Sequence, residues 1–456
     1  IKQSGYEFPR QRITINLAPA HTRKAAPVFD LAIAVGLLLG SEQIQVQNLG
    51  EFVMIGELSL SGSLRSVKGV LPFCLAARDQ GKKHIIVPHA NITEASLVKG
   101  LKVYGVSHLT EAIALLTRPA IAQAAAHQWK PSSGTRTDID FSEVVGQSFA
   151  KRGLEIAAAG GHNIMLIGPP GTGKTMLAER TVGILPPLTL EETLETTKIY
   201  SIAGQLNEKQ FWIKYRPFRS PHHSISNCGL IGGSSPPRPG EISLAHHGVL
   251  FLDELLEFSR QSLDILRQPI EDGGITLVRQ GRSVRFPSAF MLIVALNPCP
   301  CGYYGDIEKA CRCTEYDLLR YWRKLSAPLL DRFDIFVELP RICTEQLQQA
   351  SASESSRDIQ ERVTQARQRQ LKRFHQQDFF CNGRLNNKLL NQFCLLDKSS
   401  QTFIDRAVKH LDLSPRSYHR LLKVSRTIAD LEQSESIEVQ HVAEAVQFRN
   451  AFDKYF

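Results

Sequence analysis

Runs of consecutive apolar residues alternate with helical patterns between residues 141 and 340. The runs are short, and they are apolar at successive positions instead of at every second one. They are NIMLIG (163–168), GVLFLDE (248–254), FMLIVALN (290–297) and FDIFVEL (333–339). A strand that is apolar on both faces is typical of a parallel sheet covered by helices on both sides. The segment 141–340 is therefore predicted to be an α/β core built on a parallel sheet.

The chain before this segment has a similar but weaker pattern. Residues 1–118 alternate short β-branched runs with stretches rich in alanine and leucine, which predicts a smaller α/β domain. The β-branched runs are 12–17, 84–87 and 103–105. Residues 119–140 mix alanine, proline, serine, glycine and threonine with no sustained apolar period, as is typical of a linker.

After residue 340 the strand signal ends. Amphipathic helical patterns follow, for example at 414–431 and 439–448. They predict a small helical lid domain over residues 341–456. A chain of 456 residues accommodates three such domains at the usual ~100–200 residues each.

Composition narrows the class of partner. The chain has 54 Lys and Arg against 45 Asp and Glu, a net charge of +9. This excess suits a polyanion such as DNA if it is concentrated on one surface, and means little if it is spread thinly. The apolar run 31–40 is shorter than the ~20 residues of a membrane span, and no export signal opens the chain. We therefore expect a cytoplasmic protein with no membrane contact.

The chain opens without Met and in the middle of a pattern. Its native N-terminus is therefore expected upstream of Ile1, and the first domain is expected to be incomplete at its N-terminal end.

Residues 168–175 form the strongest chemical signal. They read Gly168, Pro169, Pro170, Gly171, Thr172, Gly173, Lys174 and Thr175, the G-x-x-x-x-G-K-[ST] pattern of a phosphate-binding loop. Its glycines let backbone N–H groups surround the β-phosphate, Lys174 adds a positive charge, and the Thr175 hydroxyl can bind Mg²⁺. A Gly-Pro turn before a helix is the alternative. An apolar strand before the loop and a helix after it count against that alternative.

Carboxylates at the end of a second strand predict hydrolysis. Asp253 and Glu254 follow the apolar residues 249–252. Asp253 fits as the acid on the Mg²⁺ side, and Glu254 as the group that orients the attacking water. The alternative is a strand followed by an acidic helix cap. A third strand ends at Asn297, whose side chain can contact the γ-phosphate, although Asn-Pro is also an ordinary turn.

Longer strings around these residues resemble a known family. They are LLDRFD (329–334), RPFRSPHHSIS (216–226), GLIGGSSPPRPGEISLAHHGVLFLDE (229–254), LRQPIEDG (266–273), NPCPCGYYGD (297–306) and SPRSYHRLLKVSRTIADL (414–431). With the phosphate-binding loop, they are similar to AAA+ ATPases of the magnesium-chelatase-like branch. Within that branch they most resemble the ComM/YifB family of bacterial proteins.

The resemblance implies roles for three side chains, ATP and Mg²⁺ as cofactors, and an assembly. Asn297 matches sensor 1, Arg332 the arginine finger and Arg416 sensor 2. An arginine just before an edge strand can reach a neighbour's γ-phosphate, and a structural Asp331–Arg332 pair is the alternative. Arg416 and Arg420 lie at i, i+4 on one helical face, so the residues alone leave either one open. A site shared between subunits implies a ring, which in AAA+ proteins is usually a hexamer.

Residues 51–98 and 23–38 resemble the Lon protease domain. That family cleaves peptides with a serine nucleophile activated by a lysine. This chain has Val28 and Leu71 at the matching positions, and neither side chain can attack a carbonyl or move a proton. We therefore expect a Lon-like scaffold or assembly module without protease activity.

Four of the nine cysteines lie within residues 299–313. Cys299 and Cys301 form one C-x-C pair, and Cys311 and Cys313 form a second. Two such pairs on the arms of one hairpin can close a tetrahedral Zn²⁺ site. Free buried thiols and partial disulfides are the alternatives.

Basic residues near the third strand suggest a contact with DNA. Arg279, Arg282 and Arg285 bracket a Gln-Gly turn just ahead of that strand. In related AAA+ rings the hairpin at this place projects into the pore, where arginines would hold backbone phosphates. Arg219 is a second candidate. Solvated surface charges are the alternative for all four.

Two classes of function follow. The ComM resemblance implies a hexameric, ATP-driven DNA motor that promotes branch migration of recombination intermediates, as in natural transformation. The alternative is a chelatase-like ATPase that remodels a protein partner for metal insertion. An ATP-dependent protease is disfavoured by Val28 and Leu71.

Overall fold

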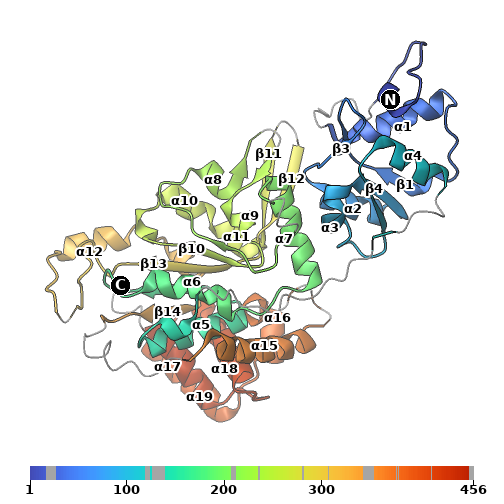
Figure 1. The fold of residues 1–456 in the computed structure, drawn as a ribbon. Helices are drawn as coiled ribbons and strands as arrows, with labels where there is room; N and C mark the ends of the chain where they lie inside the picture. Colours follow the sequence, from blue (N-terminus) through green and yellow to red (C-terminus); the bar gives the residue numbers. More distant parts are fainter. Residues whose placement is uncertain are drawn as a thin grey trace. The chain divides into compact units, whose positions relative to one another are not determined.

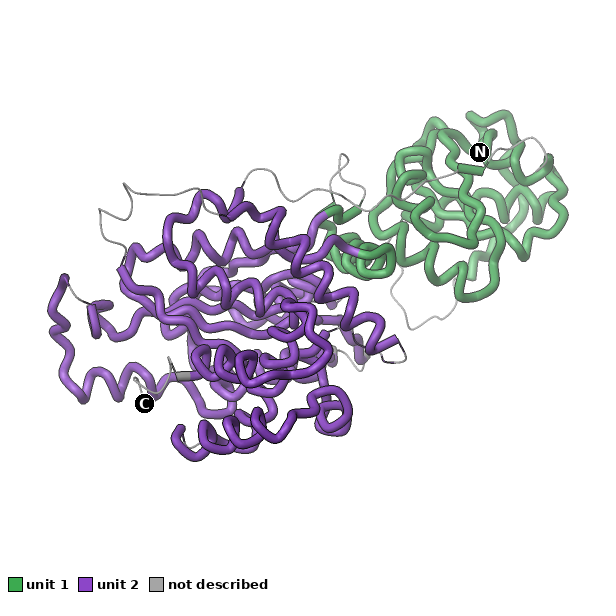
Figure 2. The backbone as a smooth tube through the Cα atoms, turned by 90° about the horizontal axis from the view of Figure 1, so that it is seen from below, with its two compact units in different colours: residues 1–131, 189–214 green, residues 132–188, 215–456 purple. Residues whose placement is uncertain are grey.

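The computed structural model describes residues 1–16, 27–118, 124–125, 139–206, 212–234, 237–279, 282–306, 308–341, 354–375, 377, 379, 381–411 and 413–450. The chain divides into two compact units (Figures 1 and 2). Unit 1 contains Ile1–Pro131 and Thr189–Lys214, and unit 2 contains Ser132–Leu188 and Tyr215–Phe456. Within the described part of the chain, no helix is both long and apolar enough to cross a bilayer.

Unit 1 is built on a three-stranded parallel sheet with the order β1-β4-β5. Ile85 and Val87 of β4 belong to one buried cluster and Ile86 to another, so the sheet has an apolar layer on each face. Helices α2 and α3 supply the first layer, and α1 and α4 supply the second. The elements are β1 (Phe52–Met54), β4 (His84–Pro88), β5 (Lys102–Val106), α1 (Asp30–Gly40), α2 (Val70–Asp79), α3 (Ile92–Ala95) and α4 (Leu109–Thr117).

The β-branched run 12–17 was expected to be a strand, and this expectation is wrong for residues 12–16. These residues are irregular, their side chains are mostly exposed, and Ile15 is 52% exposed. A strand needs a neighbour for its backbone hydrogen bonds, and no ladder in the described residues includes this segment. Leu17 lies outside the described residues.

Helix α7 (Leu190–Ala203) is grouped with unit 1 although it follows the phosphate-binding loop in the sequence. Ser201 donates to the buried Glu94 carboxylate (3.1 Å), which also accepts the backbone N–H of Leu71 (3.0 Å). The sequence had placed residues 189–214 within the 141–340 core. The short hairpin of β2 (Glu57–Leu58) and β3 (Leu64–Arg65) completes the unit.

Unit 2 contains the predicted parallel sheet. Five strands lie in the order β14-β6-β13-β10-β7, and every pairing is parallel. The four apolar runs form its four longest strands, and their residues are almost all fully buried. The strands are β6 (Ile164–Ile167), β7 (Phe218–Arg219), β10 (Val249–Leu252), β13 (Met291–Leu296) and β14 (Ile335–Glu338). The α/β prediction for this segment is confirmed.

Helices cover both faces of this sheet. Val249 and Phe251 of β10 belong to the cluster that contains the helices α5 and α6, and Leu250 and Leu252 belong to the opposite one. One side has α5 (Ser148–Gly160) and α6 (Lys174–Ile184). The other side has α8 (Asn227–Ile231), α9 (Glu241–Leu244), α10 (Arg260–Ile265), α11 (Arg267–Asp272), α12 (Glu315–Trp322) and α13 (Ala327–Leu330).

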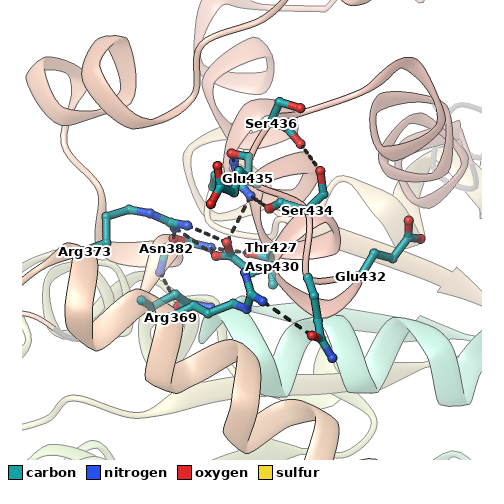
Figure 3. A network of polar contacts seen from close by, with 12 residues as sticks. Arg369, Arg373, Asn382, Thr427, Asp430, Glu432, Ser434, Glu435 and Ser436 are labelled. Carbon is teal, nitrogen blue, oxygen red and sulfur yellow. Dashed lines mark hydrogen bonds and ion pairs between the residues drawn. The ribbon is translucent and has the colours of Figure 1, made fainter.

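The C-terminal helices share the cluster of α5 and α6 (Figure 1). They are α15 (Ser356–Arg373), α16 (Asn387–Phe393), α17 (Lys398–His410), α18 (Pro415–Leu431) and α19 (Val439–Asn450). A buried polar network ties α15 to α18. Figure 3 shows Arg373 and Asn382 directed at Asp430, at 2.9 Å and 2.8 Å. Removing one partner of such a buried pair typically lowers the free energy of unfolding by about 3–5 kcal/mol. The network therefore holds α15 and α18 together.

Candidate nucleotide-hydrolysis site

The phosphate-binding loop connects β6 to α6, as predicted. Gly171 and Gly173 have φ values of +83° and +85°, a left-handed conformation that a residue with a Cβ adopts at a cost. Gly168 is needed for a different reason, because a Cβ there would lie 2.6 Å from the carbonyl oxygen of Leu339. Thr172 closes the loop by donating to the carbonyl of Pro169 (3.0 Å).

Lys174 is buried at the start of α6. Its ammonium donates to the carbonyls of Gly168 (2.6 Å) and Pro169 (2.9 Å) and to Oδ1 of Asn297 (3.2 Å). Burial lowers the pKa of Lys174 to about 8, against the attraction of the Asp253 and Glu254 carboxylates. Phosphate oxygens placed among these partners would stabilise the charged form of the lysine. The contact with Asn297 brings the predicted sensor to the phosphate-binding lysine.

This pKa predicts a pH-dependent affinity for ATP. A lowered lysine pKa means that the charged form is complete well below pH 8 and is lost as the pH rises through that value. ATP affinity should therefore fall about tenfold between about pH 7 and about pH 9. Titration with a fluorescent ATP analogue at both pH values measures it. A Lys174→Arg variant stays charged and serves as the control; an equal fall in both proteins would contradict the assignment to Lys174.

The two predicted Mg²⁺ ligands lie together. Thr175 donates its hydroxyl to Oδ2 of Asp253 (2.7 Å), and Oδ1 of Asp253 accepts the N–H of Glu254 (2.9 Å). A hydroxyl and a carboxylate are oxygen donors of the kind that Mg²⁺ prefers beside nucleotide phosphates. The donor set therefore fits Mg²⁺. The rest of its coordination would come from the nucleotide and water.

Glu254 is held in a sparsely populated backbone conformation. Its φ is +49°, which is uncommon for a residue other than glycine, and its side chain is 55% exposed. Nδ1 of His223 lies 3.5 Å from its Oε2. Because parallel strands end at the same edge, the segment after β7 meets the end of β10 here. The sequence argument missed His223 as a neighbour of Glu254, because the two residues are far apart in the chain and meet only where their strands end.

Arg332 and Arg416 lie at a second place: Arg332 is on the loop before β14, and Arg416 is near the start of α18 and faces that loop. Arg332 is 8% exposed, forms an ion pair with Glu271 of α11 and donates to the carbonyl of Pro328 (2.8 Å). Arg416 lies 3.6 Å from Asp331. In the described part of the chain, neither guanidinium bonds to a residue of the phosphate-binding loop. The Asp331–Arg332 pair that the sequence left open is not formed, because Asp331 pairs with Arg416.

Arg420 anchors the same loop to the lid helix. It forms an ion pair with Asp334, whose other oxygen lies 3.2 Å from Nδ1 of the buried His162. Burial alone would raise the pKa of Asp334, but Arg420 and His162 hold that pKa well below its usual range. His162 also contacts Thr427 of α18 (2.8 Å). Arg420 is thus structural, which leaves Arg416 as the exposed arginine of the two.

The basic hairpin is formed as predicted. Strands β11 (Gly274–Arg279) and β12 (Arg282–Pro287) are antiparallel, with Arg279 opposite Arg282 at the end of the ladder. Residues 280–281 lie outside the described residues. Arg285 is exposed and donates to the carbonyl of Asp272 (3.2 Å). Arg219, the second DNA candidate, instead forms a bidentate pair with Glu241 (2.5 and 2.6 Å).

The four predicted cysteines also come together. Their sulfur atoms lie within 4.8 Å of one another, in the loop that follows Asn297. Cys299 is buried and the other three are partly exposed.

Comparison with known proteins identifies the family. The protein family described as "Magnesium chelatase, subunit ChlI" matches residues 140–347, and the family of its C-terminal part matches residues 353–449. A third family, "Subunit ChlI of Mg-chelatase", matches residues 1–91. The chain is 45% identical to "Uncharacterized protein YifB" of Escherichia coli K12 over 98% of this chain and 87% of that protein. It is 43% identical to "Competence protein ComM" of Haemophilus influenzae over 97% of this chain and 86% of that protein. A "Magnesium-chelatase subunit ChlI" of Olisthodiscus luteus is 27% identical over 35% of this chain and 50% of that protein.

The parallel sheet, the phosphate-binding loop and the carboxylates beside it define a P-loop protein of the AAA+ class. The chain belongs to the ComM/YifB family of magnesium-chelatase-like AAA+ proteins. Membership in this family indicates an ATPase that uses ATP and Mg²⁺.

Proposed function

We propose that this protein is an ATP-driven motor that works on branched DNA as a homo-hexameric ring. The hydrolytic part rests on one observation above all: Lys174, Thr175, Asp253 and Asn297 meet at the ends of three neighbouring strands, with Glu254 beside them. Lys174 would bind the β- and γ-phosphates, and Thr175 and Asp253 would hold Mg²⁺. Glu254 would orient the attacking water, and Asn297 would contact the γ-phosphate. Mg²⁺ would neutralise charge that develops on the phosphates.

The ring is proposed because neither candidate arginine contacts the phosphate-binding loop of its own chain in the described residues. Within the described residues, Arg332 on the loop before β14 contacts Glu271, and Arg416 on α18 contacts Asp331; neither contacts the phosphate-binding loop. An arginine presented at a subunit edge can complete a neighbour's site. Since Arg416 on α18 pairs with Asp331, the residue next to Arg332, we propose that Arg416 acts in the same neighbouring site as Arg332.

The DNA part is supported by three observations. One full-length relative is called a competence protein, the chain carries a net charge of +9, and the arginine hairpin directly precedes β13, which ends at Asn297. A change at the γ-phosphate could therefore be transmitted along β13 to the hairpin. We propose Arg279, Arg282 and Arg285 as phosphate contacts. Arg219 would first have to release Glu241, so it is a weaker candidate.

The cheapest test of this function is ATP turnover with and without DNA. Single-stranded or branched DNA should raise the ATP turnover of the wild-type protein. Lys174→Ala should not hydrolyse ATP with or without DNA. If DNA has no effect while the basal rate is normal, the ATPase assignment stands and the DNA assignment fails.

The hairpin makes a separate prediction about salt. Replacing Arg282 with alanine should weaken binding to single-stranded DNA of any sequence and reduce the log-salt slope by about 0.7, the value of one phosphate contact. Basal ATP turnover should not change. Arg357→Ala removes the same charge from an exposed position on α15 and is the matched control. If the log-salt slope is unchanged in Arg282→Ala, the hairpin is a solvated surface turn and does not contact DNA phosphates.

A second candidate is a chelatase-like ATPase that remodels a protein partner for metal insertion. The family models, which are named after a magnesium-chelatase subunit, favour it. A normal basal rate of ATP turnover that does not change when DNA is added would support this candidate. Proteolysis has no support, because Val28 and Leu71 are both buried in one apolar cluster of unit 1. Hydrolysis needs only ATP and Mg²⁺, so a zinc ion at the cysteine loop would be structural.

A further inference from the structure

The loop 299–313 carries a compact group of sulfur atoms outside the hydrolytic residues. Sγ of Cys299 lies 3.3 Å from that of Cys301 and 3.7 Å from that of Cys311, and the last two are 3.5 Å apart. Sγ of Cys313 completes a set in which all four lie within 4.8 Å of one another. All four cysteines are free thiols in the structure.

These separations match a single tetrahedral metal site. Four sulfurs at the usual ~2.3 Å from zinc lie about 3.8 Å from one another. The three measured separations of 3.3–3.7 Å are close to this value. Thiols are weak donors and weak acceptors, so four of them gain little by converging without an ion.

The backbone of the loop supports the same arrangement. Gly302 has a φ of +85°, and its N–H donates to the carbonyl of Cys299 (2.9 Å), so the chain turns back directly after the first pair. The N–H of Cys313 donates to Sγ of Cys311 (3.4 Å).

We propose that Cys299, Cys301, Cys311 and Cys313 bind one zinc ion through their four Sγ atoms. A site with four thiolates favours zinc over Mg²⁺, because soft sulfur ligands select soft metals. Four protein ligands leave no open position for water or substrate, so the ion is structural.

The position of the loop defines what the ion stabilises. Cys299 follows Asn297 by two residues, and the carbonyl between them, that of Pro298, accepts the indole N–H of Trp322 (3.2 Å). On the other side, a Cβ on Gly302 would lie 2.8 Å from Cδ of Pro170 in the phosphate-binding loop. The zinc-bound loop therefore lies against both the sensor residue and the nucleotide loop. It positions them without taking part in hydrolysis.

Metal analysis of the purified full chain tests the proposal. The wild-type protein should contain one zinc ion per chain, and a Cys301→Ser/Cys311→Ser double variant should contain none. Cys228→Ser, which changes an exposed cysteine outside the loop, should keep the zinc and is the control. Wild-type protein that stays free of zinc after incubation with a zinc salt would overturn the proposal, and so would iron in its place.

A second measurement does not depend on the folding of the variant. Wild-type protein loaded with Co²⁺ should show the absorption bands of a tetrahedral cobalt–thiolate centre, and Cys228→Ser should show the same bands. Removing the metal with a chelator should expose four additional reactive thiols per chain. Peptide mapping without reductant that finds a Cys299–Cys311 disulfide in the freshly purified protein would contradict the proposal. ATP turnover is not needed for either readout, so both outcomes are independent of the proposed DNA function.

Discussion

Replacing Glu254 with glutamine should lower ATP turnover by about 10²–10⁴-fold and leave ATP binding nearly unchanged. Glutamine keeps the size of the side chain but cannot accept the proton of the attacking water. Phosphate binding is assigned to Lys174 and the backbone of its loop, which the change does not touch. Single-turnover hydrolysis measured beside the binding of a fluorescent ATP analogue separates the two effects.

The control for this variant is a change at a neighbouring residue in the segment after β7. His223 lies 3.5 Å from the Glu254 carboxylate, so His223→Ala disturbs the surroundings of Glu254 and leaves the carboxylate in place. It should retain most of the turnover that Glu254→Gln loses. Turnover near the wild-type rate in Glu254→Gln would remove this residue from the catalytic machinery.

Replacing Arg332 with alanine should have the largest effect on the chemical step. An arginine finger contributes about 10³–10⁵-fold to the rate, and its loss should not affect ATP binding in the same subunit. Mixing Arg332→Ala with Lys174→Ala subunits should restore part of the activity. In the mixed ring, an Arg332→Ala subunit binds ATP, and a Lys174→Ala neighbour supplies the missing arginine.

Glu271 provides the matched control, because it is the ion-pair partner of Arg332. Its side chain is 56% exposed, and Glu271→Ala removes the same ion pair while leaving the guanidinium in place. If Arg332 is a finger, Glu271→Ala keeps its turnover. If both variants lose activity together and mixing restores nothing, the arginine is structural and the ring argument fails.

The nucleotide site was largely predictable from sequence because its signals are local. The apolar runs become the strands of one sheet, and parallel strands end at one edge, so Lys174, Asp253 and Asn297 had to meet there. The hairpin was predictable for the same reason, since Gln280-Gly281 connects two β-type segments.

Features that depend on distant partners were not predictable in this way. The ion pair of Arg332 with Glu271 joins the loop before β14 to α11, and neither position carries a periodic signal for the other. The assignment of α7 to unit 1 has a similar cause, since its buried side chains include Thr193, Thr196 and Thr197 and give little amphipathic contrast. The expected strand at 12–16 failed for a related reason, because a β-branched pattern cannot show whether a partner strand exists.

We propose that ATP hydrolysis at this site moves branched DNA. The most direct measurement follows a labelled strand in a synthetic three- or four-way junction, with ATP and Mg²⁺, for the wild-type protein and for Glu254→Gln. The wild-type protein should release the labelled strand only when ATP can be hydrolysed, and Glu254→Gln should bind the junction and leave it unmoved. A wild-type protein that hydrolyses ATP at the same rate with and without the junction, and leaves every labelled strand in place, would contradict this proposal.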